Sequence, residues 1–315
     1  MNRSLKALAI AAVVGMFAVQ LVGTLVTKSG SADGCGASWP LCDGSLLPAA
    51  NIHSVIEYSH RVISGIVGLL VFAFAYLVWR RLPDRPDARY LGLTGVAFII
   101  IQSALGAAAV LWPQPKMVLA LHFGISLTAF AAVLLPAVII AQVEKGTTHR
   151  QTPVGRPVRT WAWIGLLYVY GVIYTGAYVR HTNSHMACLD WPLCNGALIP
   201  ELSGAVGIQF FHRLAAAFML VVLGWLVKVT MGERERRPDV YRAGLLIGGL
   251  GLAQVLSGGW VILSHLSMTA MMVHSAIVTC LFGALSYLCL QVSREPAVRV
   301  EAGAPGRMQP AETLR

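Results

Sequence analysis

Long apolar stretches alternate with short polar segments along the whole chain. A helix needs about 20 apolar residues to cross a hydrocarbon core of about 30 Å, so each stretch is a candidate membrane span. In lipid, backbone amides must be bonded within their own segment unless strands close into a barrel, and the alternating pattern of barrel strands is missing. The pattern therefore predicts eight transmembrane helices, at approximately 6–27, 57–79, 90–111, 117–141, 160–180, 207–230, 241–263 and 270–291.

Composition agrees with a membrane protein. Of 315 residues, 56% are hydrophobic and only 12% are charged, and the mean hydropathy is +0.67. A soluble domain of this size carries more charge. The chain nevertheless has a formal net charge of +10.

The positive charge gathers in the segments between spans two and three, four and five, and six and seven. Basic loops stay in the cytoplasm, so this distribution places both termini there and makes nucleic acid an unlikely partner. The first apolar run is too long for a signal peptide, and an Arg-rich transit peptide is missing. We therefore expect a multi-pass protein of a bacterial plasma membrane.

The second half of the sequence repeats the first at an offset of 152 positions. Trp-Pro-Leu-Cys at 39–42 recurs at 191–194. Upstream of this motif the offset is 153, so Gly23 matches Gly176. Four spans per copy, an even number, give both copies the same direction through the membrane, unlike inverted-repeat transporters.

This repeat predicts an all-α fold of two tandem four-helix bundles related by a pseudo-twofold axis. The N-terminal unit would span 1–145 and the C-terminal unit 161–292. A cytoplasmic linker, 146–160, would join them, and a cytoplasmic tail would cover 293–315.

Four of the nine histidines lie in predicted spans, at matching positions: His60, His122, His212 and His274. An ionisable side chain within a membrane is by default a functional hypothesis. Imidazole is a good iron ligand, and bundle cores commonly hold cofactors between facing helices. We interpret each pair as the two axial ligands of one heme iron. The alternative is that each His forms structural hydrogen bonds between helices.

Neighbouring residues support the heme interpretation. Small residues that leave room for a flat macrocycle follow the first pair, namely Ser64, Gly65, Gly68 and Gly124. Arg61 and Arg213 lie at the outer membrane surface, where a guanidinium can contact a heme propionate. The alternatives are ordinary close helix packing for the small residues and snorkelling for the arginines.

Cysteines occur in two kinds of position. Cys35 and Cys42 frame the first external loop, and Cys188 and Cys194 frame the third. Because these loops face an oxidising compartment, each pair can form a disulfide. The other two cysteines lie within the last span, where we expect buried apolar fillers; they are Cys280 and Cys289.

Glu57 distinguishes the two halves. It precedes His60 by three residues and so shares its helical face, whereas the matching residue in the second half is Gln209. An acid beside only one histidine pair suggests that the first site performs chemistry and that the second holds a cofactor. The alternative is a carboxylate stabilised by the dipole at a helix N-terminus.

Taken together, these residues resemble heme A synthase of the bacterial type with an external cysteine pair in each half. The resemblance covers all eight spans and rests on Glu57-Tyr-Ser-His60-Arg61, His122, Phe211-His212-Arg213, His274 and both cysteine loops. No single motif is as specific as the combination.

The resemblance implies that His212 and His274 hold heme b, while His60 and His122 receive the substrate, heme O. The catalytic residues would be Glu57, His60 and His122. The implied reaction oxidises a porphyrin methyl of heme O to formyl through a hydroxymethyl intermediate, giving heme A for cytochrome oxidase. The implied partners are a heme O synthase and an electron donor, and a homo-oligomer is compatible with the sequence.

Two other functions are compatible with part of the pattern. A quinone-linked electron-transfer cytochrome with two hemes would use the four histidines equally well, although it gives Glu57 and the loop cysteines no purpose. A membrane thiol oxidoreductase, which would use the cysteines, or a transporter would leave the histidines structural.

Overall fold

Each predicted span forms one long helix. The structure is a computed structural model that describes residues 3–112, 115–146 and 152–294. Within these ranges, eight helices are long and apolar enough to cross a membrane. They are α1 (Arg3–Lys28), α2 (Ile52–Arg81), α3 (Pro86–Leu111), α4 (Lys116–Glu144), α5 (Arg156–His181), α6 (Gly204–Met231), α7 (Pro238–Leu263) and α8 (Met268–Ser293). The prediction of a helical multi-pass membrane protein is confirmed.

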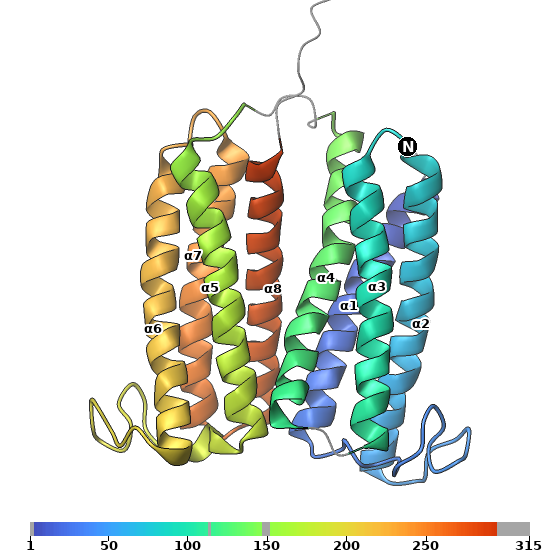
Figure 1. Cartoon of the computed structure of the whole chain (residues 1–315), viewed down its shortest axis with the longest axis vertical. Coiled ribbons are helices and arrows are strands. Elements are labelled where there is room, and N and C mark those ends of the chain that lie inside the picture. The colour runs from blue at the N-terminus through green and yellow to red at the C-terminus, as the bar shows by residue number, and fades with distance from the viewer. Residues whose placement is uncertain (1–2, 113–114, 147–151, 295–315) are drawn as a thin grey trace, which may run out of the picture.

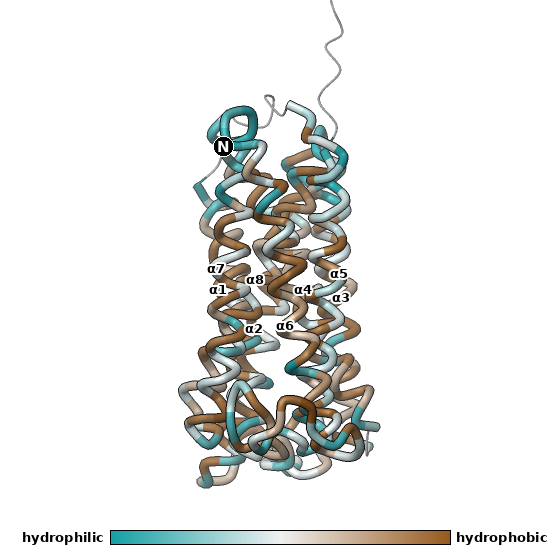
Figure 2. Tube along the Cα trace, turned by 90° about the vertical axis from the view of Figure 1, so that its left-hand side faces the viewer, coloured by the Kyte–Doolittle hydropathy of each residue, from teal (hydrophilic) through white to brown (hydrophobic). Residues whose placement is uncertain are grey.

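Helix boundaries extend beyond the apolar stretches into the polar residues at either end (Figure 2). The side chain of Asn51 caps α2 by accepting a hydrogen bond from the Ser54 amide at 2.9 Å. Pro86 and Pro238 begin α3 and α7, at positions where no amide hydrogen is needed. Helix α5 begins at Arg156, inside the predicted linker. Residues 147–151 of that linker and 295–315 of the predicted tail lie outside the described residues.

The helices form two groups of four, α1–α4 and α5–α8, which stand side by side (Figure 1). The start of α1 and the end of α8 lie at one end of the molecule, and the two long loops lie at the other. Each group has its own apolar core. Phe74 and Val71 belong to the first core, and Leu223, Leu226 and Ile247 to the second.

Helix α4 contributes to both cores because it lies between the two groups. Leu127 belongs to the second core, whereas Phe130 and Val133 belong to the first. Helix α4 packs against α5 and α8, and α1 also packs against α8. We call this contact between the halves the seam.

A glycine allows close packing at the seam. A Cβ on Gly124 of α4 would lie 2.6 Å from Cε1 of Tyr174 on α5, closer than real atoms approach. The hydroxyl of Tyr174 also donates to that of Tyr170 at 2.9 Å, and the Tyr170 hydroxyl lies 3.1 Å from the hydroxyl of Thr128 on α4. Aromatic packing and hydrogen bonds therefore join α4 to α5.

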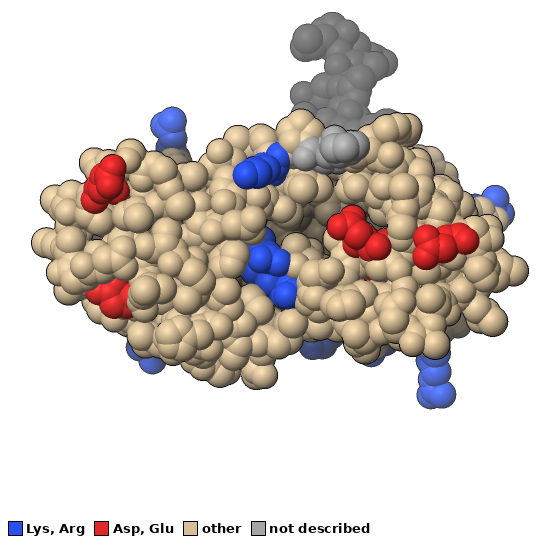
Figure 3. Space-filling view, turned by 90° about the horizontal axis from the view of Figure 1, so that it is seen from below, with Lys and Arg blue, Asp and Glu red and all other residues tan. Residues whose placement is uncertain are grey.

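The loop end of the seam is basic. Seen from this end, Lys and Arg side chains lie in a hollow near the middle of the molecule (Figure 3). Arg180, near the end of α5, donates a hydrogen bond to the carbonyl of Thr27 in α1. This contact ties the two halves together close to the loops.

Candidate functional site

The four histidines predicted as iron ligands lie near the loop end of their helices, two in each half. The imidazoles of His60 on α2 and His122 on α4 are close enough to interact electrostatically. The same holds for His212 on α6 and His274 on α8. All four rings are only partly buried. That the two imidazoles of each half share one iron stays a prediction.

A glycine from the neighbouring helix faces every one of these rings. A Cβ on Gly23 would lie 3.2 Å from Cε1 of His60, and one on Gly176 would lie 2.9 Å from Cε1 of His212. The corresponding distances are 3.7 Å for Gly106 with His122 and 3.3 Å for Gly258 with His274. Any larger residue would crowd at least three of the four imidazoles. The signal was present in the sequence, because these glycines coincide in both halves.

The small residues that follow the first histidine pair have different surroundings from one another. A Cβ on Gly65 would meet nothing within 4 Å, and one on Gly68 would meet only Ile99, at 3.8 Å. Gly124 makes room for Tyr174 at the seam. The space beside Gly65 is open, and room for a macrocycle there stays a prediction.

In the C-terminal half, a hydroxyl group fixes the orientation of each imidazole. Thr175 Oγ1 lies 2.8 Å from Nδ1 of His212 and donates its only proton to the carbonyl of Val172 at 2.7 Å. It must therefore accept a hydrogen bond from the N–H at Nδ1 of the imidazole. This leaves Nε2 of His212 with a lone pair, the state in which imidazole binds a metal.

His274 is held in the same way. Ser257 Oγ lies 2.8 Å from its Nδ1 and donates to the carbonyl of Gln254 at 2.9 Å. The Gln254 amide nitrogen lies 3.0 Å from Nε2 and 3.3 Å from Nδ1 of His274. Because Nδ1 already donates to Ser257, Nε2 is the nitrogen that can accept. The Gln254 amide must turn away for Nε2 to bind iron.

The N-terminal half lacks both hydroxyls. Nδ1 of His60 and Nδ1 of His122 are buried, and neither has a hydrogen-bond partner among the described residues. By the repeat, Val22 replaces Thr175 and Leu105 replaces Ser257. Neither apolar side chain can hold a ring nitrogen. The two histidine pairs therefore share one geometry but differ in how firmly the rings are oriented.

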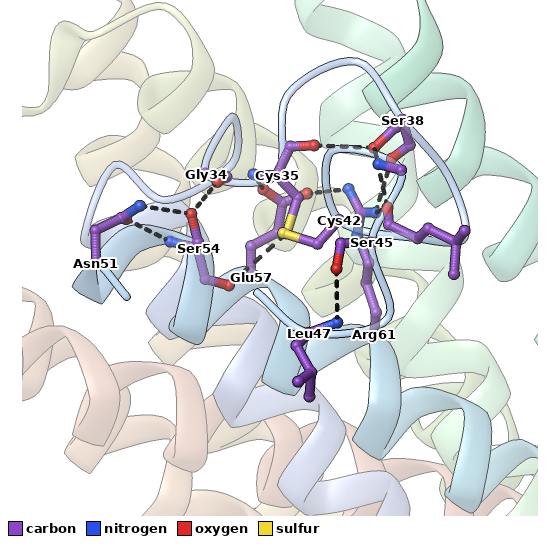
Figure 4. Close-up of a disulfide and its surroundings, with 12 residues drawn as sticks. Gly34, Cys35, Ser38, Cys42, Ser45, Leu47, Asn51, Ser54, Glu57 and Arg61 are labelled. Carbon is purple, nitrogen blue, oxygen red and sulfur yellow. Dashed lines mark hydrogen bonds and ion pairs between the residues drawn. A yellow bond between two sulfur atoms is a disulfide. The ribbon is translucent and has the colours of Figure 1, made fainter. Parts of the chain in front are cut away.

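Glu57 is fully engaged with the first disulfide loop (Figure 4). Its side chain is buried, with 3% of the residue exposed. One carboxylate oxygen accepts from the Cys35 amide at 2.8 Å, and the other pairs with Arg61 at 2.5 Å. In the other half, the Gln209 amide oxygen accepts from the Cys188 amide at 2.6 Å. Both residues therefore anchor a loop, and only Glu57 does so with a charge.

The two arginines predicted to contact propionates also bind loop carbonyls. Arg61 donates to the carbonyls of Ser38, at 2.7 Å, and Leu41, at 2.6 Å. Arg213 donates to the carbonyls of Cys188, at 3.0 Å, and Leu193. Contact with a propionate stays a prediction.

Both loop cysteine pairs are disulfide-bonded, Cys35 with Cys42 and Cys188 with Cys194. The remaining two cysteines differ from one another. Cys289 is a buried member of the second core, as expected, but Cys280 is exposed on α8, so its interpretation as a buried filler was wrong. Burial of a cysteine within a span cannot be judged from hydropathy, because lipid-facing and core-facing positions are equally apolar.

The residues of both pairs fit a heme. The two imidazoles of each half would hold the heme iron, and the facing glycines leave their rings uncrowded. In the C-terminal half, the hydroxyl groups also present Nε2 as the free nitrogen of His212. The fold and the site define a class: a multi-pass membrane protein of two tandem four-helix bundles, each with an imidazole pair suited to heme iron.

Comparison with known proteins identifies the group within this class. Residues 51–286 match the model of the cytochrome oxidase assembly protein family, and the chain belongs to that family. It is 42% identical to the heme A synthase of Symbiobacterium thermophilum over 302 residues, covering 93% of this chain and 98% of the relative. It is 38% identical to the heme A synthase of Geobacillus kaustophilus over 314 residues, covering 99% of both chains. The family resemblance inferred from the motifs is confirmed.

Proposed function

We propose that this protein is a membrane oxidoreductase that converts heme O to heme A. The reaction oxidises one porphyrin methyl group to a formyl group through a hydroxymethyl intermediate. Near full-length similarity to proteins named heme A synthase supports this function. The histidine pair in each half supports it further, because one heme must be changed while another stays bound.

The hydroxyl groups behind the C-terminal imidazoles carry the assignment of the two halves. A ligand that is held in one orientation and one tautomer suits a permanently bound cofactor. We therefore assign His212 and His274 to heme b. When bound there, heme b supplies one-electron redox chemistry. Thr175 and Ser257 would hold the two imidazoles in place.

The N-terminal half is the proposed substrate site, with His60 and His122 as ligands of heme O. Imidazoles without a partner at Nδ1 can reorient as a substrate arrives and a product leaves. Glu57 places a buried negative charge, held by Arg61, on the helical face that also carries His60. We assign to it the stabilisation of positive charge, or the transfer of a proton, at the edge of the substrate ring.

The remaining assignments concern the surroundings of the enzyme. The basic segments at the end opposite the disulfides support a topology in which that end and both termini face the cytoplasm of a bacterium. Arg61 and Arg213 are the proposed propionate contacts. A heme O synthase would supply the substrate, an external donor would supply electrons, and the enzyme can act as a homo-oligomer.

The decisive experiment is pigment analysis of a bacterial host that makes heme O, with and without this chain. We expect heme A only when the chain is present, and neither heme A nor the hydroxymethyl compound with His60→Ala. A reduced-minus-oxidised spectrum of the purified protein should show a low-spin b-type signal that disappears in His212→Ala and His274→Ala. A b-type signal without heme A formation would instead indicate an electron-transfer cytochrome.

A further inference from the structure

Three polar side chains lie one helical turn deeper in the N-terminal half than its histidines. Ser64 follows His60 by four residues and Ser126 follows His122 by four, so each serine shares a helical face with its histidine. Both helices run away from the loop end, so each serine lies about 6 Å further along the axis. Gln20, on α1, lies three residues before Gly23, the glycine that faces His60. It therefore lies at a similar depth to the two serines.

The three side chains belong to the interior of the bundle. Helix α1 packs against both α2 and α4. Ser126 Oγ donates to Gln20 Oε1. Ser64 lies on the stripe of α2 that carries buried Glu57 and Val67. We call Gln20, Ser64 and Ser126 the polar layer.

Hydrogen-bonding capacity in this layer is left unused. Gln20 is 7% exposed, yet its amide nitrogen has no partner within the described chain. The buried hydroxyl of Ser64 also has none. A buried polar group without a partner is costly, and native proteins retain few of them. A ligand that brings its own hydrogen-bonding group would remove this cost.

The layer is specific to this half. In the internal repeat, Gln20 corresponds to Ile173, Ser64 to Ala216 and Ser126 to Val278. All three counterparts are apolar. A four-helix bundle with a histidine pair therefore does not need a polar layer in order to fold. The layer is one of the differences between the two histidine sites.

We propose that the polar layer is a subsite for a neutral hydroxyl group on the edge of the substrate. This inference rests on the proposed function, in which His60 and His122 bind heme O. Heme O differs from heme b in carrying a hydroxyalkyl side chain, and we assign that hydroxyl to the subsite. The layer offers an amide donor and a hydroxyl but no cation, which suits an alcohol better than a propionate.

The subsite explains how one chain keeps two similar hemes apart. In the N-terminal half, the hydroxyl of heme O satisfies Gln20 and Ser64, whereas heme b would leave them buried and unpaired. Sites built to bond a hydroxyl reject analogues that lack it for this reason. The apolar counterparts in the C-terminal half give a hydroxyl no partner and so favour heme b.

The test is a spectroscopic titration of the purified, heme b-loaded protein with heme O and with heme B. We expect the wild type to bind heme O more tightly than heme B, and the polar layer to account for about tenfold of that ratio, the value of one hydrogen bond. The variant Gln20→Ile/Ser64→Ala/Ser126→Val, which installs the residues of the other half, should lose about tenfold of that preference, because only the contribution of the hydroxyl is removed. Ser286→Ala is the matched control, because it removes a buried hydroxyl that bonds its own helix at Phe282, and should keep the preference.

Retained heme b in the C-terminal half verifies that the triple variant is folded. An unchanged preference for heme O in that variant overturns the subsite. If the triple variant keeps its preference for heme O but releases the hydroxymethyl compound, the subsite is also wrong. The layer would then recognise the hydroxyl that is made during the reaction. If wild-type binding of heme O does not depend on His60, the proposed substrate site itself is wrong and the subsite falls with it.

Discussion

Thr175 Oγ1 lies 2.8 Å from Nδ1 of His212, and its own proton is already donated to the carbonyl of Val172. The hydroxyl can therefore only accept from the imidazole. The equivalent pair in the other half is Val22 and His60, where no such bond is possible. The difference between Thr175 and Val22 therefore determines whether the imidazole is held in one orientation or can reorient.

Replacing Thr175 with Val should weaken heme b binding by about 10- to 100-fold, the usual effect of removing a partner of a metal-bound His. The midpoint potential of the b-type signal should also rise, because the imidazole becomes a poorer electron donor. Thr175→Ser retains the hydroxyl and should behave like the wild type. Heme content and redox titration measure both effects. Equal potentials in the Val and Ser variants would contradict the role given to Thr175.

Glu57→Gln should distinguish the two roles given to Glu57, which are to anchor the first loop and to take part in the reaction. Glutamine can still accept from the Cys35 amide, as Gln209 does from Cys188, but it removes the charge that faces Arg61. We expect a folded protein that keeps heme b and accumulates heme O or the hydroxymethyl compound, detected by pigment chromatography. Glu57→Ala, which also loses the anchor, should in addition destabilise the loop. Ordinary heme A production by Glu57→Gln would leave the carboxylate with an anchoring role only.

Loss of the second disulfide should affect stability more than turnover. Cys188 and Cys194 are six residues apart, and cross-linking a loop this short contributes about 2 kcal/mol in the chain-entropy model. The double serine variant should show a lower melting temperature or weaker heme retention, with some activity left. Cys280→Ser, at an exposed free cysteine, is the control and should change neither property. Complete inactivity in a stable, heme-loaded double variant would point instead to redox chemistry at this pair.

Gly124→Ala should disturb the seam, since the new Cβ would overlap the Tyr174 ring. Overpacking of this kind costs about 1–3 kcal/mol, measurable as a lower melting temperature in detergent. Gly65→Ala is the control, because nothing lies within 4 Å of the added atom. Combining Gly124→Ala with Tyr174→Leu should restore stability, since Leu21 is the counterpart of Tyr174 in the first half. Equal melting temperatures for the two alanine variants would show that the seam adapts without cost.

Hydropathy and the internal repeat were enough to predict the eight helices. The bilayer sets the length of each span, and the repeat places the second four spans at matching positions. The histidine pairs followed from their cost in lipid. The hydroxyls of Thr175 and Ser257 were missed because contact with a ring depends on the rotation of each helix, which a uniformly apolar span does not reveal. A search for differences between the halves would have found both.

Other parts of the site required the three-dimensional arrangement. The two bonds of Glu57 depend on the path of the loop that contains Cys35, which no periodic pattern predicts. Gly124 was assigned to the surroundings of a heme from its proximity in sequence to His122. Its actual neighbour, Tyr174, lies on a helix of the other half, and only the packing of α4 against α5 brings the two together.

The seam also determines which halves can pair. Tyr174 fits against Gly124, whereas the reciprocal position, Ala276, has a methyl group where Gly124 has none. Two copies of the C-terminal half would therefore set Tyr174 against Ala276, and two copies of the N-terminal half would set Leu21 against Gly124 and leave a gap. Because the two unlike halves are joined in one polypeptide, they associate within the same molecule. Their effective concentration is then much higher than that of separate molecules. Every molecule is thereby made with one site of each kind, a stoichiometry that freely pairing single units could not guarantee.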